Sequence, residues 1–182
     1  TLVSIEGLFG SLYDDVLTGD DGDNRLEGGW GNDVLVGGAG DDLLVGGPDS
    51  DTMTGGAGKD TFRDRPEWFN GSTITDFSAG DKLVFVEVDP ATFMFSLSGS
   101  TLTFSGGSLT LQHMPAGARL TSSVNWYGGI ELQLAAASVP GAFNADFNGD
   151  GRSDVFWRND NGWISSWLGQ AGGGFVGDST IG

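Results

Sequence analysis

One apolar residue recurs every nine positions between Gly10 and Arg63, in six contiguous units with glycine and aspartate at fixed places. The apolar residue stands at position eight and alternates with its neighbours, which predicts a short strand with that side chain inward. The GGxGxD segment before it is typical of a turn, because glycine accepts positive φ. We therefore expect one turn and one short strand from each unit. The units are GSLYDDVLT, GDDGDNRLE, GGWGNDVLV, GGAGDDLLV, GGPDSDTMT and GGAGKDTFR.

Two successive units would form one coil of 18 residues with strands on opposite faces. Coils stacked about 4.8 Å apart bring every second turn into register. The side chains at position six would then form two columns, one of Asp15, Asp33 and Asp51 and the other of Asn24, Asp42 and Asp60. Carboxylates at this separation repel one another, so the stack requires a cation between turns. Calcium accepts an irregular cage of carboxylate and backbone carbonyl oxygens, whereas magnesium prefers a tight octahedron.

A flexible Gly-Asp linker and a solvated acidic tail are the competing interpretations of this stretch. A linker gives no reason for an apolar residue at every eighth position of the unit. A solvated tail gives no reason for acidic residues at a fixed phase. Both features favour a folded repeat.

The six units resemble the RTX (repeats-in-toxin, hemolysin-type) calcium-binding nonapeptide, a β-helix repeat. The resemblance implies an all-β fold, a parallel β-roll with calcium held between turns n and n+2. It also implies ligands from the six position-six residues and from turn glycines, here Gly28, Gly31, Gly37, Gly40, Gly46, Gly55 and Gly58. Tyr13 and Asp49 replace the glycine of position four, and Asn24 replaces a carboxylate. We therefore expect about four ions, chiefly at Asp33, Asp42, Asp51 and Asp60.

Composition narrows the class of protein. The net charge is -17, and residues 1–63 hold 13 acidic against 3 basic side chains. This field repels nucleic acid and anionic membranes and attracts cations. Cysteine is absent, so only bound ions could staple the fold, and no apolar run is long enough to insert into a membrane. About four divalent ions would offset about eight excess charges, so we expect an expanded ion-free chain and a compact ion-bound one.

Residues 64–139 are predicted to form a β-rich capping region beyond the roll at 1–63. The segment ITDFSAGDKLVF resembles the motif that follows RTX rolls and caps their open end. After a turn at Asn70-Gly71, alternating stretches predict antiparallel strands packed on the roll as a sandwich. The predicted strands cover 73–77, 82–88, 92–97, 101–105, 108–113 and 130–134. His113 lacks a cysteine or a GxSxG elbow to activate, so a structural or surface role is expected.

Residues 140–182 are predicted to be a separate segment. DFNGDGRSD places oxygen donors at Asp146, Asn148, Asp150 and Asp154, a spacing that wraps a chain around calcium. Position twelve of an EF-hand would be Glu and is Trp157 here, so the EF-hand is rejected. The segment resembles the FG-GAP or VCBS repeat, which implies one calcium held by those four side chains and the backbone of Arg152. It further implies one β-propeller-like blade of a longer protein. Trp163 and Trp167 would either stack on a sugar or pack the blade.

The leading hypothesis is a non-catalytic, calcium-binding module of a secreted bacterial protein. By resemblance, RTX proteins leave through a type I secretion machine unfolded and fold on meeting external calcium. Two alternatives stay open. The chain could be the C-terminal part of a secreted protease, lipase or polysaccharide-degrading enzyme, or an adhesin or surface-layer module that binds a cell-surface glycan. The opening TLVSIEGLFG resembles the interior of a domain, so a fragment of a longer protein is expected.

Overall fold

The computed structural model describes residues 6–125 and 128–135, and the backbone of four strands between 143 and 177. The chain divides into two compact units, Thr1–Ala136 and Ala137–Gly182. The described residues are almost entirely strands and turns, and their one helix is α1 (Pro66–Phe69). The predicted all-β class is therefore confirmed.

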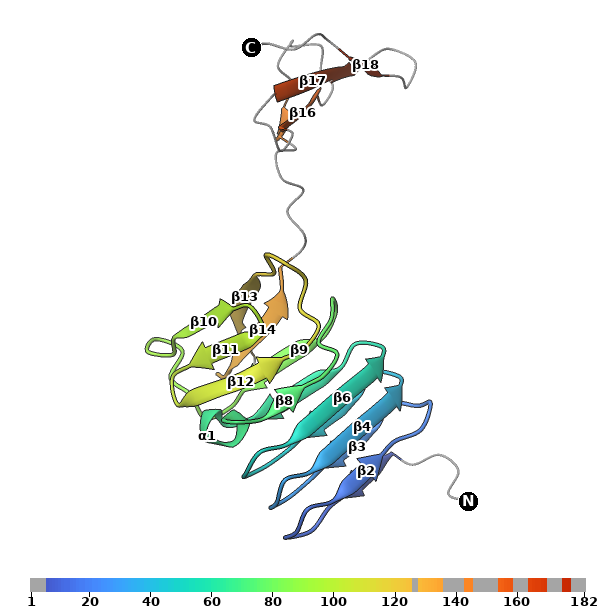
Figure 1. Cartoon of the computed structure of the whole chain (residues 1–182), viewed down its shortest axis with the longest axis vertical. Coiled ribbons are helices and arrows are strands. Elements are labelled where there is room, and N and C mark those ends of the chain that lie inside the picture. Colours follow the sequence, from blue (N-terminus) through green and yellow to red (C-terminus); the bar gives the residue numbers. More distant parts are fainter. Residues whose placement is uncertain are drawn as a thin grey trace. The chain divides into compact units, whose positions relative to one another are not determined.

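The first unit is built on two parallel sheets that face each other (Figure 1). One contains β1 (Gly7–Phe9), β3 (Arg25–Glu27), β5 (Leu43–Val45) and β7 (Thr61–Asp64). The other contains β2 (Val16–Thr18), β4 (Val34–Ala39), β6 (Thr52–Ala57) and β8 (Thr73–Ile74). Successive nonamers alternate between the sheets, as a β-roll requires, because each GGxGxD turn reverses the chain after three or more strand residues.

The position-eight side chains stack in register across the coils. On one sheet the paired residues are Leu17, Leu35, Met53 and Ile74, and on the other they are Leu8, Leu26, Leu44, Phe62 and Leu83. Every member from Leu26 onward is buried, whereas Leu8 and Leu17 at the first coil are only partly buried. The inward position predicted from the nine-residue period therefore forms the core of the roll.

The strands that follow the roll extend its own two sheets. In one sheet β9 (Lys82–Phe85) pairs in parallel with β7, and β14 (Ile130–Leu134) and β13 (Leu120–Val124) continue in antiparallel fashion. In the other, β12 (Gly107–Leu111) pairs in parallel with β8, and β11 (Thr101–Phe104) and β10 (Phe95–Ser98) follow.

This arrangement corrects the expected sandwich packed on the roll. The last coil offers unpaired N–H and C=O groups at its edges, and edge pairing satisfies these groups where face-to-face packing would not. The strand β13 and the helix α1 were not predicted. Pro66 begins α1, where its missing N–H costs nothing. The predicted turn at Asn70-Gly71 is confirmed, with Gly71 at φ 90°.

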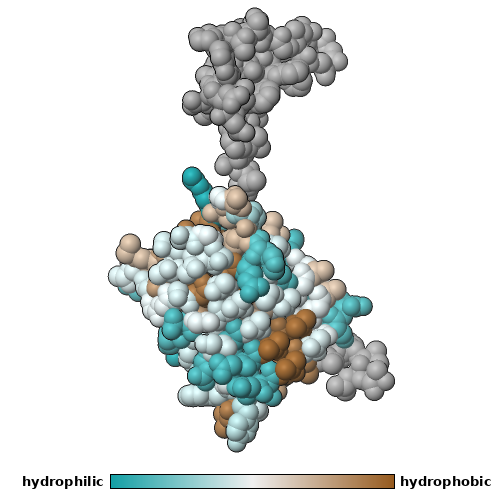
Figure 2. All heavy atoms as spheres, in the orientation of Figure 1, coloured by the Kyte–Doolittle hydropathy of each residue, from teal (hydrophilic) through white to brown (hydrophobic). Residues whose placement is uncertain are grey.

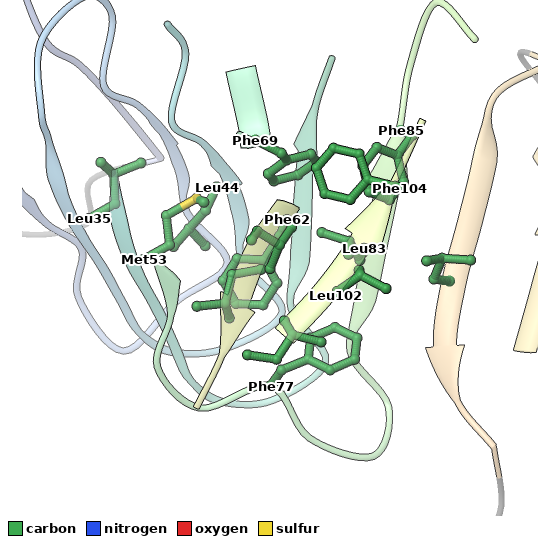
Figure 3. Packing of buried hydrophobic residues seen from close by; sticks show 14 of the residues in the cluster. Leu35, Leu44, Met53, Phe62, Phe69, Phe77, Leu83, Phe85, Leu102 and Phe104 are labelled. Atoms are coloured by element: carbon green, nitrogen blue, oxygen red, sulfur yellow. The ribbon is translucent and has the colours of Figure 1, made fainter. Parts of the chain in front are cut away.

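Aromatic rings fill the space between the sheets beyond the repeat. Phe62 and Phe77 lie with ring centroids 6.2 Å apart, and Phe85 contacts Phe69 and Phe104 at 5.1 and 4.8 Å (Figure 3). These rings join the leucines of the roll in one continuous hydrophobic cluster. The residues after the repeat therefore share a core with it.

The first coils of the roll leave apolar side chains exposed. Val16 on β2 and Val34 on β4 are exposed, as is Trp30 in the turn between β3 and β4. Figure 2 shows a hydrophobic patch over these coils, within a surface that is otherwise largely hydrophilic on this face. The inner apolar layer is also less covered at this end, because Leu8 and Leu17 are only partly buried whereas Leu83 on β9 is fully buried.

The second unit contains four antiparallel strands, β15 (Phe143–Ala145), β16 (Asp154–Arg158), β17 (Ile164–Gly169) and β18 (Phe175–Gly177). Asp154 begins β16 and Trp167 lies in β17, and only their backbone is described. The other residues of the predicted calcium loop (Asp146, Asn148, Asp150 and Arg152) and Trp163 lie outside the described residues.

Candidate metal centre

The position-six aspartates form two hydrogen-bonded ladders between turns. In one column, Asp33 Oδ1 accepts from the Asp15 N–H at 2.8 Å, and Asp51 Oδ1 accepts from the Asp33 N–H at 2.9 Å. In the other, Asp42 Oδ1 accepts from the Asn24 N–H at 2.8 Å, and Asp60 Oδ1 accepts from the Asp42 N–H at 3.0 Å. One oxygen of each carboxylate is thus committed to the backbone of the preceding coil, which fixes the direction of the other.

That other oxygen has no hydrogen-bond partner at Asp33, Asp42, Asp51 or Asp60. Each of these four residues is at most 2% exposed. A buried carboxylate oxygen without a donor is costly, because it has given up its hydration without replacement. Four such oxygens at equivalent places in successive turns indicate a positively charged partner that recurs with the repeat.

Position-one glycines leave the space beside these oxygens open. A Cβ atom on Gly37 would lie 2.3 Å from Asp42 Oδ2 and 2.5 Å from the Gly55 carbonyl oxygen, which belongs to the next coil. The same addition on Gly28 would meet Asp33 Oδ2 at 2.2 Å and the Gly46 carbonyl at 2.7 Å. A carboxylate oxygen and a carbonyl oxygen therefore converge on a small space that a side chain would fill.

Glycines at positions two and four serve the backbone instead. Gly38 and Gly40 adopt φ of 122° and 105°, a region that other residues rarely enter. Asp49 replaces glycine at position four and still adopts φ 84°. The fifth turn therefore keeps the positive φ of this position although the glycine is replaced.

Burial changes the acidity of these carboxyls. It raises the pKa of Asp51 from 3.8 to about 7 and that of Asp60 to about 6, although hydrogen bonds from the Asp33 and Asp42 N–H groups partly lower them. Burial also raises the pKa of Asp33 and Asp42, with smaller contributions from neighbouring acidic groups. The charged form is disfavoured at each position unless a cation compensates it.

The first two units have a different arrangement at position six. Asp15 Oδ2 accepts hydrogen bonds from the Ser11 N–H and hydroxyl at 2.6 and 2.8 Å. Asn24 Oδ1 accepts from the Asp20 N–H at 2.7 Å. Their oxygens are engaged within their own turns, so the geometry gives Asp15 and Asn24 less capacity to hold an ion than the four later residues.

Four residues beyond the repeat were missed from sequence: two continue the position-six columns, and two accept from glycine N–H groups of the last turns. Ser72 Oγ and Asp81 Oδ1 each accept at 3.0 Å, from the N–H groups of Asp51 and Asp60 respectively. Asp76 accepts from the Gly55 and Gly56 N–H groups, and Asp64 Oδ2 accepts from the Gly47 N–H at 3.0 Å. The nine-residue period ends at Arg63, so only the three-dimensional stacking identifies these partners.

Position five forms two further, exposed ladders that the sequence analysis also missed. Asp14 Oδ1 accepts from the Asn32 N–H, and Asp23 and Asp41 accept in the same way from Asp41 and Lys59 at 2.8 and 2.9 Å. The recurrence of Asp or Asn at this position in the first four units was a usable signal. These side chains tie neighbouring turns together at the surface.

The donor set suits calcium. The converging oxygens are hard carboxylate and carbonyl ligands, which Ca²⁺ prefers. Within the described residues, no three carboxylate or imidazole side chains converge on one point, so backbone carbonyls are required to complete a cage. Asp33, Asp42, Asp51 and Asp60 would hold the ions. At Asp33 and Asp42 the carbonyl oxygens of Gly46 and Gly55 lie beside the free carboxylate oxygen.

The remaining candidate for chemistry is His113. Its exposed ring lies with Nδ1 2.9 Å from the Thr75 carbonyl oxygen, and its backbone adopts φ 57°. The ring is therefore held by a main-chain group at a turn after β12.

No helix in the described residues is long and apolar enough to cross a membrane.

Comparisons with known proteins agree with this assignment. Residues 8–35 and 27–62 match the family model of the RTX calcium-binding nonapeptide repeat (4 copies). This stretch therefore consists of RTX calcium-binding repeats, as the sequence analysis predicted. No curated protein matches the chain.

The solved structures similar to this chain include a subunit of an epimerase and a lipase. The R3 subunit of the mannuronan C5-epimerase AlgE6 from Azotobacter vinelandii has 27% identity and a TM-score of 0.41, covering 69% of this chain and 71% of its own. The extracellular lipase LipA from Serratia marcescens has 17% identity and a TM-score of 0.21. That match covers 80% of this chain and 19% of the lipase.

Proposed function

We propose that this chain is a non-catalytic calcium-binding module of a secreted bacterial protein, and that extracellular calcium drives its folding after type I secretion. The observation that carries the proposal is the set of four buried, unpartnered carboxylate oxygens at Asp33, Asp42, Asp51 and Asp60. Without cations these groups oppose folding, and with cations they link successive coils. Binding to the folded state alone stabilises it by mass action.

The secretion part of the proposal rests on the weakness expected of such sites. Extracellular calcium modules bind in a range of about 10⁻⁴ to 10⁻³ M. Sites of this strength are empty in a calcium-poor cytosol and filled outside the cell. A chain that remains unfolded until it meets calcium is suited to export through a narrow channel.

The non-catalytic part of the proposal is supported by the structural roles of the buried acidic side chains and of His113. The buried acidic side chains of the roll are engaged in ladders or aimed at the proposed cages. The exposed His113 is held by a backbone carbonyl. We extend the calcium proposal to one ion at loop 146–154, on the spacing of its oxygen donors alone.

Small-angle scattering of the whole chain tests the proposal. In excess chelator, the radius of gyration should approach about 45 Å, the value for an unfolded chain of this length. In millimolar calcium it should fall well below that value, because the roll becomes compact. A chain that is equally compact in both conditions would overturn the proposal.

A further inference from the structure

A fifth buried carboxylate stands outside the repeat. Asp64 ends β7 and is 2% exposed, and its Oδ1 has no hydrogen-bond partner. The three ion pairs in the described part of the chain involve Arg25, Arg65 and Lys82, and none reaches Asp64. Burial raises the pKa of Asp64 to about 6, although backbone N–H groups and the Arg63 charge partly lower it. Its Oδ1 nevertheless lacks a hydrogen-bond partner, as does one oxygen of each of the four repeat aspartates.

In the coil that follows Gly46, Asp64 stands where the repeat would have its position-one glycine. It lies 18 residues after Gly46, the spacing of one full coil. Within the roll, the N–H of Gly29 donates to the Gly46 carbonyl oxygen at 3.1 Å. One coil later, the N–H of Gly47 donates to Asp64 Oδ2 at 3.0 Å instead. A side-chain carboxylate thus replaces a backbone carbonyl at the end of this column.

The second carboxylate at this place is that of Asp51. A Cβ atom on Gly46 would lie 2.2 Å from Asp51 Oδ2, so the unpartnered oxygen of Asp51 borders Gly46. The adjoining residue Gly47 is the one that holds Asp64. Asp51 and Asp64 therefore each present one unpartnered, buried oxygen at the turn that begins at Gly46, and the two carboxylates are close enough for Asp64 to contribute to the raised pKa of Asp51.

We propose that Asp51 Oδ2 and Asp64 Oδ1 together bind a calcium ion that closes this column of the roll. The inference rests on the proposed function and adds a ligand that the nonapeptide does not contain. Two carboxylates would neutralise the ion fully, with the remaining ligands from carbonyl oxygens of the turn. This makes the terminal site the most strongly charged cage of its column.

At the end of the column that contains Asp42 and Asp60, the corresponding acidic residue is Asp76, and it has no oxygen free to bind an ion. Asp76 stands 21 residues after Gly55, and its two oxygens accept from the Gly55 and Gly56 N–H groups at 3.0 and 2.8 Å. Both oxygens of Asp76 are thus partnered and the side chain is only half-buried. Only Asp64 combines burial with a free oxygen, so only its column ends in a two-carboxylate cage.

The substitution Asp64→Asn tests this site. Asparagine keeps an oxygen that can accept from the Gly47 N–H, but it loses the negative charge. The matched control is Glu67→Gln, which removes one charge from an exposed residue three positions away. Calorimetric titration of each whole chain with calcium should show one ion fewer, or one site at least about tenfold weaker, in Asp64→Asn only.

Three results have distinct meanings. If the unchanged chain binds no calcium, the proposed function fails and this site fails with it. If the unchanged chain binds calcium and Asp64→Asn matches it in both stoichiometry and affinity, only the Asp64 site is wrong. If Asp64→Asn does not fold, anomalous scattering from calcium-loaded crystals of the unchanged chain decides: a peak within about 2.6 Å of both carboxylates supports the site. Its absence, with other cages filled, overturns it.

Discussion

The main-chain N–H of Asp33 donates to Asp51 Oδ1 at 2.9 Å, while Asp51 Oδ2 is buried without any hydrogen-bond partner. One carboxylate therefore joins two coils with one oxygen and offers the other to an ion. In the second column, Asp60 Oδ1 likewise accepts from the Asp42 N–H, and Asp60 Oδ2 has no hydrogen-bond partner. Because backbone register and ion site share one side chain, coil stacking and calcium binding should be coupled.

The substitution Asp42→Asn should weaken calcium binding by about tenfold or more at one site, because ligand charge sets calcium affinity. Asparagine retains an acceptor for the Asn24 N–H, so the ladder can persist. The control Asp41→Asn removes the same charge from an exposed neighbour whose oxygen serves only the Lys59 N–H. Calorimetry should show unchanged stoichiometry and affinity for the control. Equal losses in both variants would point to general electrostatics and not to a cage.

The substitution Gly37→Ala should weaken calcium binding by displacing oxygens of one cage. Gly37 is not among the residues with positive φ, but its added Cβ would lie 2.3 Å from Asp42 Oδ2 and 2.5 Å from the Gly55 carbonyl oxygen. Both oxygens would have to move to admit the methyl group. Gly22→Ala is the control in the same column, where the nearest atom to the Cβ would be Asp20 Oδ1 at 3.3 Å. A calcium titration monitored by tryptophan fluorescence should show weaker binding for Gly37→Ala than for Gly22→Ala. Equal calcium affinities of the two variants would mean that the oxygens beside Gly37 do not form a calcium cage.

Calcium binding should weaken as the pH falls from 7.5 to 5.5. The folded-state pKa values of Asp51 and Asp60, about 7 and about 6, lie above their ordinary value, so the ion-free fold binds protons that the unfolded chain releases. The resulting stability of the ion-free fold is complete below about pH 4 and is lost as the pH rises through 6 to 7, at about 1.4 kcal/mol per pKa unit. Calcium must displace these protons at acid pH. Titrations in buffers of different ionisation enthalpy should reveal proton release, and a pH-independent affinity would contradict this coupling.

The nine-residue period was sufficient to predict the roll, because one apolar residue and one aspartate per unit repeat at fixed phase. The stacking of Leu26, Leu44 and Phe62 follows directly from that phase. The partners that end the columns could not be predicted in this way. Asp64 and Asp81 lie beyond the period, and a change from 18 to 21 residues per coil shifts the alignment after Met53.

The edge pairing of the later strands was equally inaccessible from sequence. Alternation in Gly107–Leu111 predicts a strand but does not identify its neighbour. The neighbour is determined by the unpaired edge of β8 and by the aromatic cluster around Phe85, both of which arise only when distant segments meet. Local pattern thus predicted most of the strands, although not β13, and long-range pairing determined their order.

The most direct test of the account is a far-UV circular dichroism titration of the chelator-treated chain with calcium, in parallel with magnesium. The account predicts a cooperative gain of β-structure in calcium at about 10⁻⁴ to 10⁻³ M and no comparable change in magnesium, which requires a tighter octahedral shell. The spectrum should revert on adding chelator. A β-rich spectrum that is already complete in chelator and unchanged by calcium would contradict the claim that ions at Asp33, Asp42, Asp51 and Asp60 hold the roll together.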